Sequence, residues 1–135
     1  MIRFENRFDE YAYRVASLPL AADARVEEGQ WVTVKNGELV LAKSTDKKAF
    51  IAIGSNREGR DQVAGKFMRK ISFLVGDFML TVNNFDTAKT YTDMTPLKVV
   101  DGNLAPVESA ETATATVVAY ALGAPVNGFL RIVSA

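Results

Sequence analysis

The fold class of this chain is decided by the stretch Gln30-Trp31-Val32-Thr33-Val34-Lys35-Asn36-Gly37-Glu38-Leu39-Val40-Leu41-Ala42. Its Asn36-Gly37 pair lies between two segments in which apolar and polar residues alternate. Asn-Gly is the preferred two-residue loop of a type I′ β-hairpin, because both loop residues need positive φ. The loop also fixes the register, and the expected cross-strand pairs are Lys35–Glu38, Val34–Leu39, Thr33–Val40 and Val32–Leu41.

The two-residue period of a strand sorts these side chains onto two faces. One face is apolar and is expected to be buried, and it carries Val32, Val34, Leu39 and Leu41. The other face carries Trp31, Thr33 and Val40 with the opposed charges of Lys35 and Glu38, so the hairpin is predicted to be half-buried and one-sided. Trp31 lies on the less apolar face, and exposed Trp side chains often anchor protein contacts. We therefore regard Trp31 as a candidate interface residue.

A second copy of the hairpin pattern lies 65 residues later, in residues 96–106, where Asp101-Gly102 replaces Asn36-Gly37. The shift reproduces the apolar face, since Val32, Val34 and Leu39 correspond to Leu97, Val99 and Leu104. Pro106 is expected to end its strand or to place it at a sheet edge, because proline donates no hydrogen bond. The segments 49–54 and 116–121 that follow the hairpins also correspond loosely. Internal duplication and coincidence both explain the similarity, since such hairpins are common.

Three further segments complete the β pattern. Residues 66–82 form a long apolar strand, in which Gly76-Asp77 is either a hairpin loop or a bulge. Residues 107–116, where Thr and Ala alternate, are either a closely packed strand or a loop that becomes ordered on assembly. Residues 128–133 predict a last strand after a turn, which would tie the end of the chain into a sheet.

The first 18 residues have helical spacing and strand alternation together, and Pro19 ends either element. They are either an arm that packs on a neighbouring molecule or a first strand of the chain's own core. For Tyr11 to Leu18 the strand is at least as well supported, whereas Phe4 and Phe8 favour the arm. The sequence thus predicts an all-β fold, which is a small β-barrel or β-sandwich built from two hairpin-led units. Residues 1–18 are predicted to be an N-terminal arm or a first strand, and residues 19–135 are predicted to form a single β domain.

Composition excludes several functions. The chain has 135 residues, no Cys and no His, which removes thiolate chemistry, histidine bases and the usual zinc ligands. Sixteen basic residues balance sixteen acidic ones, so neither nucleic acid nor an anionic membrane is an expected partner. No secretory signal, membrane-length apolar run or catalytic motif occurs. We predict no catalytic residue, no cofactor and no metal.

The polar segment 54–62 is the nearest approach to a chemical site. Arg57 and Arg60 could bind an anion, and the two acids in the segment could bind a metal. Alternating charges on an exposed hairpin connection are better explained by solvation and by protection of a strand edge. If the segment has a function, its mixed charges suit a contact between subunits more than catalysis.

The chain resembles the small capsid decoration proteins of tailed bacteriophages, also called cement or auxiliary head proteins. The features that carry the resemblance are the lead-in 21–32, the short hairpin 34–39, the strand 50–54 and a second turn-plus-strand unit. The resemblance covers most of the chain as a pattern of turns and strands, and no signature motif transfers an individual residue. It implies a β-barrel or β-sandwich that is made in the host cytoplasm and binds the outer capsid surface as a dimer or trimer, often through an N-terminal arm.

The expected partner is therefore the major capsid protein, together with other copies of the chain. Apolar anchors and a rim of mixed charge are sufficient for such a role. The candidate interface residues are Phe4, Phe8, Tyr11, Tyr13, Trp31, Arg57 and Arg60. Two rival functions remain: a ligand- or carbohydrate-binding β-domain, which needs an exposed aromatic platform, and a small carboxylate-dependent enzyme, which needs two acids converging in a pocket.

Overall fold

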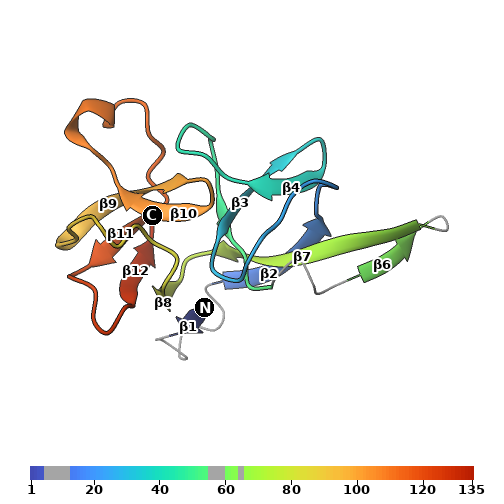
Figure 1. Cartoon of the computed structure of the whole chain (residues 1–135), viewed down its shortest axis with the longest axis horizontal. Coiled ribbons are helices and arrows are strands. Elements are labelled where there is room, and N and C mark those ends of the chain that lie inside the picture. The colour runs from blue at the N-terminus through green and yellow to red at the C-terminus, as the bar shows by residue number, and fades with distance from the viewer. Residues whose placement is uncertain (5–12, 55–59, 64–65) are drawn as a thin grey trace.

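The computed structural model describes residues 1–4, 13–54, 60–63 and 66–135, and the side chains of residues 1–2, 14–54 and 70–135. It is all-β, as the sequence predicts (Figure 1). The strands are β1 (Ile2–Phe4), β2 (Tyr13–Pro19), β3 (Trp31–Lys35), β4 (Glu38–Leu41), β5 (Phe50–Ile51), β6 (Arg60–Val63), β7 (Lys66–Gly76), β8 (Met79–Val82), β9 (Asp93–Val100), β10 (Asn103–Pro106), β11 (Ala119–Leu122) and β12 (Leu130–Ser134). A 3₁₀ helix, η2 (Ser109–Glu111), lies between β10 and β11.

Five of these strands follow one another around a closed ring. β2 pairs with β7, β3 pairs with both β4 and β5, and these three pairings are antiparallel, whereas the bridge that joins β2 to β4 is parallel. A bridge between Ala52 and Phe73 joins the end of β5 to β7. A second bridge, between Leu20 and Leu39, joins the end of β2 to β4, where the Ala21 amide also donates to the Leu39 carbonyl at 3.0 Å. The ring is a small β-barrel, as expected for one of the two predicted architectures.

The barrel interior holds one of the two apolar cores. Its buried members come from β3, β4, β7 and the segments next to β2 and β5, and are Leu20, Val26, Val32, Leu39, Ala52, Ile71 and Phe73. The rings of Phe50 and Phe73 lie 4.9 Å apart between centroids. Burial of these side chains is the main force that closes the ring.

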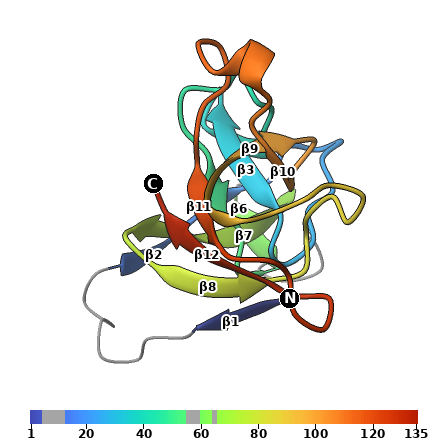
Figure 2. The same ribbon diagram turned by 90° about the vertical axis from the view of Figure 1, so that its left-hand side faces the viewer.

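Strand β6 pairs with the part of β7 that extends from the ring, and the other six strands form an antiparallel sheet in the order β1-β8-β12-β11-β9-β10. The sheet lies beside the barrel in Figure 1, and Figure 2 shows β1 next to β8 at its margin. Its buried face meets the outer side of the barrel in a second apolar core, to which Trp31, Ile51 and Leu74 contribute from the barrel. Neighbouring residues of β3 thus serve different cores, since Trp31 faces the sheet and Val32 the barrel interior.

The first hairpin has the predicted register in all four pairs. The prediction that it is buried on one side only is wrong, because the sheet covers the second face near the start of β3. Trp31 is 1% exposed and Thr33 is 8% exposed, with the Thr33 hydroxyl donating to the Lys48 carbonyl at 2.8 Å. Val34, which the alternation places on the buried face, is 41% exposed since it lies near the hairpin tip.

The second hairpin, β9–β10, also forms around Asp101-Gly102 and buries Leu97, Val99 and Leu104. β10 ends at Pro106 and is an edge strand, which confirms the expectation for this proline. In each unit, the strand that follows the hairpin pairs with the hairpin's first strand, giving the orders β4-β3-β5 and β10-β9-β11. The two hairpin-led units therefore share a topology as well as a turn pattern.

The two units are joined through the turn of the second hairpin. The Trp31 amide donates to the Gly102 carbonyl at 2.8 Å, the Gly102 amide to the Ala42 carbonyl at 3.1 Å, and the Ala42 amide to the Trp31 carbonyl at 3.0 Å. Gly102 has a φ of 86°, and a Cβ at this position would lie 2.6 Å from Leu41 Cδ2. Glycine is favoured at this position, because the positive φ strains other residues and a Cβ would force the Leu41 side chain to move.

The structure decides between alternatives at two places where the sequence leaves two open. At Gly76-Asp77 it excludes the hairpin loop, because β7 belongs to the barrel and β8 to the six-stranded sheet, so the two strands do not pair. The chain instead crosses between the two layers there, with Gly76 at a φ of 111°. Residues 107–116 do not form a strand but contain η2 and turns, and the Thr116 amide donates to the Ser44 carbonyl at 2.8 Å.

The described parts of the first 18 residues are strands. β1 pairs with β8, and β2 pairs with β7 from Tyr13 to Pro19. Both segments are therefore extended and belong to sheets of their own chain.

Substitution of Gly102 by Ala tests the junction between the units. Gly37→Ala is the matched control, because Gly37 has a similar φ of 78° but no atom within 4 Å of the place where a Cβ would be. We expect Gly37→Ala to lower the free energy of unfolding by about 1 kcal/mol, through backbone strain alone. Gly102→Ala should cost at least about 2 kcal/mol, because the clash with Leu41 is added. Equal losses in urea unfolding would contradict the tight junction.

Candidate interaction surface

The described part of the chain contains no group of three or more His, Cys, Asp or Glu side chains that could hold a metal ion. No helix within the described residues is long and apolar enough to cross a membrane.

The sequence candidates are distributed over several places. Phe8, Tyr11 and Arg57 lie outside the described residues. Phe4 is in β1 opposite Leu80, Tyr13 is in β2 opposite Gly76, and Arg60 is in β6 opposite Arg69; the side chains of these three candidates also lie outside the description. Arg60 therefore belongs to a strand, not to the connecting loop. A role for these six residues in an interface stays a prediction.

Trp31 is the one sequence candidate whose side chain is described, and the premise for choosing it is wrong. The ring is 1% exposed in the core between barrel and sheet, 6.1 Å from the ring of Phe78 between centroids. Its indole N–H has no hydrogen-bond partner among the described residues. The hairpin pattern places Trp31 on the correct face but does not reveal that a second sheet covers that face.

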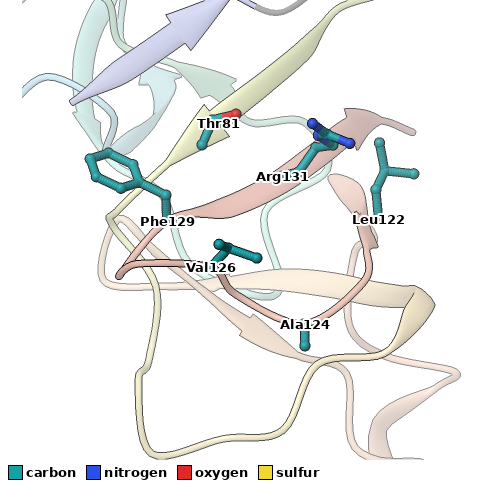
Figure 3. Close-up of a pocket in the computed structure, with 6 residues that line it drawn as sticks. All are labelled: Thr81, Leu122, Ala124, Val126, Phe129 and Arg131. Carbon is teal, nitrogen blue, oxygen red and sulfur yellow. The ribbon is translucent and has the colours of Figure 1, made fainter.

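A surface pocket of about 250 Å³ lies on the side of the six-stranded sheet that faces away from the core. Its lining, drawn in Figure 3, consists of Thr81, Leu122, Ala124, Val126, Phe129 and Arg131. Thr81 and Arg131 are cross-strand partners on β8 and β12, and their neighbours Leu80 and Ile132 point into the core. Figure 3 shows Arg131 and Leu122 at one side of the pocket, Phe129 at the other, and Val126 between them.

The pocket owes its shape to a third turn of the Asn-Gly type. Asn127 and Gly128 have φ values of 52° and 79°, as a type I′ turn requires. The Val126 amide donates to the Phe129 carbonyl at 2.8 Å, and the Phe129 amide donates back at 3.0 Å. The tight turn holds Val126 at the surface with 69% of its side chain exposed. The Asn-Gly signal predicts this turn, but the sequence does not show that it borders a pocket.

Two other hollows occur on the described surface. One is lined by Phe85, Asp86, Val100, Asn103, Leu104 and Ala105. The other, an open depression beside the barrel, is lined by Ala21, Ala22, Asp23, Ala24, Arg25, Val40 and Leu41. Each of these two hollows contains a single acidic residue, and the pocket of Figure 3 contains none.

Two titratable side chains have shifted pKa values, and both serve local structure. Burial and the nearby charge of Asp86 raise the pKa of Tyr91 to about 12. Its hydroxyl donates to the Asp86 carbonyl at 2.8 Å, and its ring packs edge-on against Phe85.

The second shifted group is Glu111. A hydrogen bond from Lys98, with a second from the Glu108 amide, lowers the pKa of Glu111 from its usual value of 4.5. The Lys98–Glu111 ion pair thereby fastens η2 to β9.

No protein family model, no curated protein and no solved structure matches this chain.

The Glu111 contact predicts a pH dependence of stability. A carboxylate whose pKa is lowered by folding stabilises the native state at pH values above its usual pKa. This contribution should be lost as the pH falls below 4.5, through the lower pKa of the folded state. Chemical unfolding of wild type and Glu111→Gln between pH 7 and pH 3 measures the effect. We expect the variant to be less stable at pH 7 and the difference to shrink in acid. A difference that is constant with pH would contradict the assignment.

Proposed function

We propose that this chain is a non-enzymatic structural protein that binds the outer surface of a phage capsid and cements neighbouring major capsid subunits. It acts there as a homo-oligomer, a dimer or a trimer. In this role the chain needs no cofactor, and its work is done by contacts between protein surfaces.

The observation that carries the proposal is the apolar pocket on the outer side of the six-stranded sheet. Four of its six lining residues are apolar, and one of these, Val126, is 69% exposed. Exposed apolar side chains beside a concave surface are typical of protein contacts, where aromatic and aliphatic groups fill pockets on a partner. Arg131 adds an exposed cation, a residue type enriched at interfaces.

The resemblance to decoration proteins supports the same function. The lead-in 21–32 and the hairpin 34–39, which carry that resemblance, form one wall of the barrel. Two units with one topology, joined by tight turns, make a rigid body. A rigid body loses little conformational entropy on docking, so more of the contact energy remains to stabilise a shell.

Both rival functions have less support. A carbohydrate-binding domain would use Trp31 as its main stacking platform, and the Trp31 ring is buried in the core. An enzyme based on two carboxylates needs a pair of acids in one hollow. Neither the pocket of Figure 3 nor the other two hollows named above have such a pair among their described lining residues.

The test is sedimentation with shells assembled from the major capsid protein encoded in the same genome as this chain. We expect the chain to sediment with expanded shells at a fixed ratio and to raise their melting temperature, because it binds the assembled state. Unexpanded shells are the matched control and should bind less, since the neighbouring subunits are arranged differently. A chain that stays in the supernatant, or a genome without a major capsid protein, would contradict the proposal.

A further inference from the structure

A second hollow opens at the β10 edge of the six-stranded sheet. It has a volume of about 290 Å³ and is lined by Phe85, Asp86, Val100, Asn103, Leu104 and Ala105. We call it the β10 hollow. Val99 faces the core, so its neighbour Val100 and the cross-strand partner Asn103 face away from it. The β10 hollow therefore shares its side of the sheet with the pocket of Figure 3, which also faces away from the core.

Main-chain pairing closes the sheet edge beside this hollow. Residues 84–86 run parallel to β10, with a bridge between Phe85 and Leu104. The Leu104 amide donates to the Asn84 carbonyl at 3.0 Å, and the Asp86 amide donates to the Leu104 carbonyl at 2.9 Å. Because both main-chain groups of Leu104 are used, an added strand cannot pair with it. A partner in the β10 hollow must therefore be held by side chains.

The hollow has an apolar and rigid floor. Phe85, Leu104 and Ala105 are at most 8% exposed, whereas Val100 at the rim is 47% exposed. The Phe85 ring packs edge-on against the Tyr91 ring, 5.4 Å away between centroids. The Tyr91 hydroxyl also donates at 2.8 Å to the carbonyl of the residue that follows Phe85. These contacts fix the floor before any partner binds.

Asp86 carries the only charge among the described lining residues. Its side chain is exposed, and its Oδ1 accepts from the Ala88 amide at 3.0 Å, which leaves Oδ2 for another donor. Within the described residues no Lys or Arg forms an ion pair with Asp86, and Lys89 pairs with Glu108 at 3.7 Å instead. An apolar floor beside a carboxylate matches a basic side chain, which has an aliphatic stem and a cationic end.

We propose that the β10 hollow receives a lysine or arginine side chain from a segment of the shell protein. The stem packs on the apolar floor beside Val100, and the cationic end donates a charge-assisted hydrogen bond to the Asp86 carboxylate. This inference rests on the proposed function and adds a second contact to it. The shell protein is the occupant because both hollows open on one side of the sheet, where a single partner surface can reach them.

Asp86→Asn separates the charge of the hollow from its shape. Asparagine can still accept from the Ala88 amide, so we expect the midpoint of urea unfolding to stay unchanged. The variant should bind expanded shells about fivefold more weakly and with less salt dependence, because an ion pair at the surface is lost. Asp77→Asn is the matched control, since Asp77 is exposed, loses the same charge and lines neither hollow. It should bind like wild type.

A second substitution tests the apolar part of the contact. Val100→Thr keeps the β-branched shape but replaces a methyl group with a hydroxyl, and it should weaken shell binding about twofold without changing the salt dependence. Val34→Thr is the matched control, because Val34 is 41% exposed at the tip of the first hairpin and lines neither hollow.

The outcomes separate the two proposals. Wild-type chain that does not bind shells overturns the proposed function and this inference together. Wild-type binding that Asp86→Asn leaves unchanged overturns only the inference. A loss of stability in parallel with the loss of binding assigns Asp86 a structural role and also overturns it. Light scattering on the free variant gives the last outcome: a reduced oligomer size would show that a second copy occupies the hollow, which overturns docking of the shell protein there.

Discussion

The structure depends on the cycle of three main-chain hydrogen bonds that links Trp31, Ala42 and Gly102. Through it, the turn of the second hairpin docks onto the base of the first, and the six-stranded sheet is set against the barrel. Because Trp31 then faces the sheet while Val32 faces the barrel interior, one strand serves both cores. Gly102 is the constraint within this cycle, since a side chain there would collide with Leu41. The cores bury most of the apolar surface, but this junction determines how they are placed.

The parts of the fold that sequence reasoning predicts are those governed by local turn chemistry. Asn36-Gly37 and Asp101-Gly102 determine both hairpin registers, and Pro106 ends an edge strand as expected. The burial of Trp31 does not follow from the hairpin pattern, because it depends on a sheet assembled from other parts of the chain. The crossing at Gly76 is undetermined by sequence for a similar reason, since only the choice of partner strands distinguishes a hairpin loop from a passage between layers.

The candidate surface is harder to predict than the fold. Asn127-Gly128 predicts a turn, yet the pocket arises from the pairing of β8 with β12 and from the side chains around that turn. Met94 carries no turn signal in the sequence, because methionine is not a residue that favours positive φ. The anomaly is visible only in the backbone. Hydrogen bonds between Thr92 and Thr95 hold the turn around Met94 in this conformation.

The fold and the proposed function are consistent in physical terms. The junction at Gly102 makes a rigid body from two β units, and the far end of the sheet presents exposed apolar groups with one cation, Arg131, at the pocket. The two features lie in different parts of the molecule, so the surface can be varied without disturbing the junction. A protein that stabilises a shell by contact alone requires both a rigid body and an adhesive surface.

The central claim is that the pocket on the outer side of the six-stranded sheet is the surface that contacts the shell. Hydrogen exchange measured on the free chain and on the chain bound to expanded shells tests this claim most directly. The amides of residues 123–129 should become protected on binding, while those of Trp31, Ala42 and Gly102 are already protected in the free chain. Protection that appears only elsewhere, for example along residues 21–25, would contradict it.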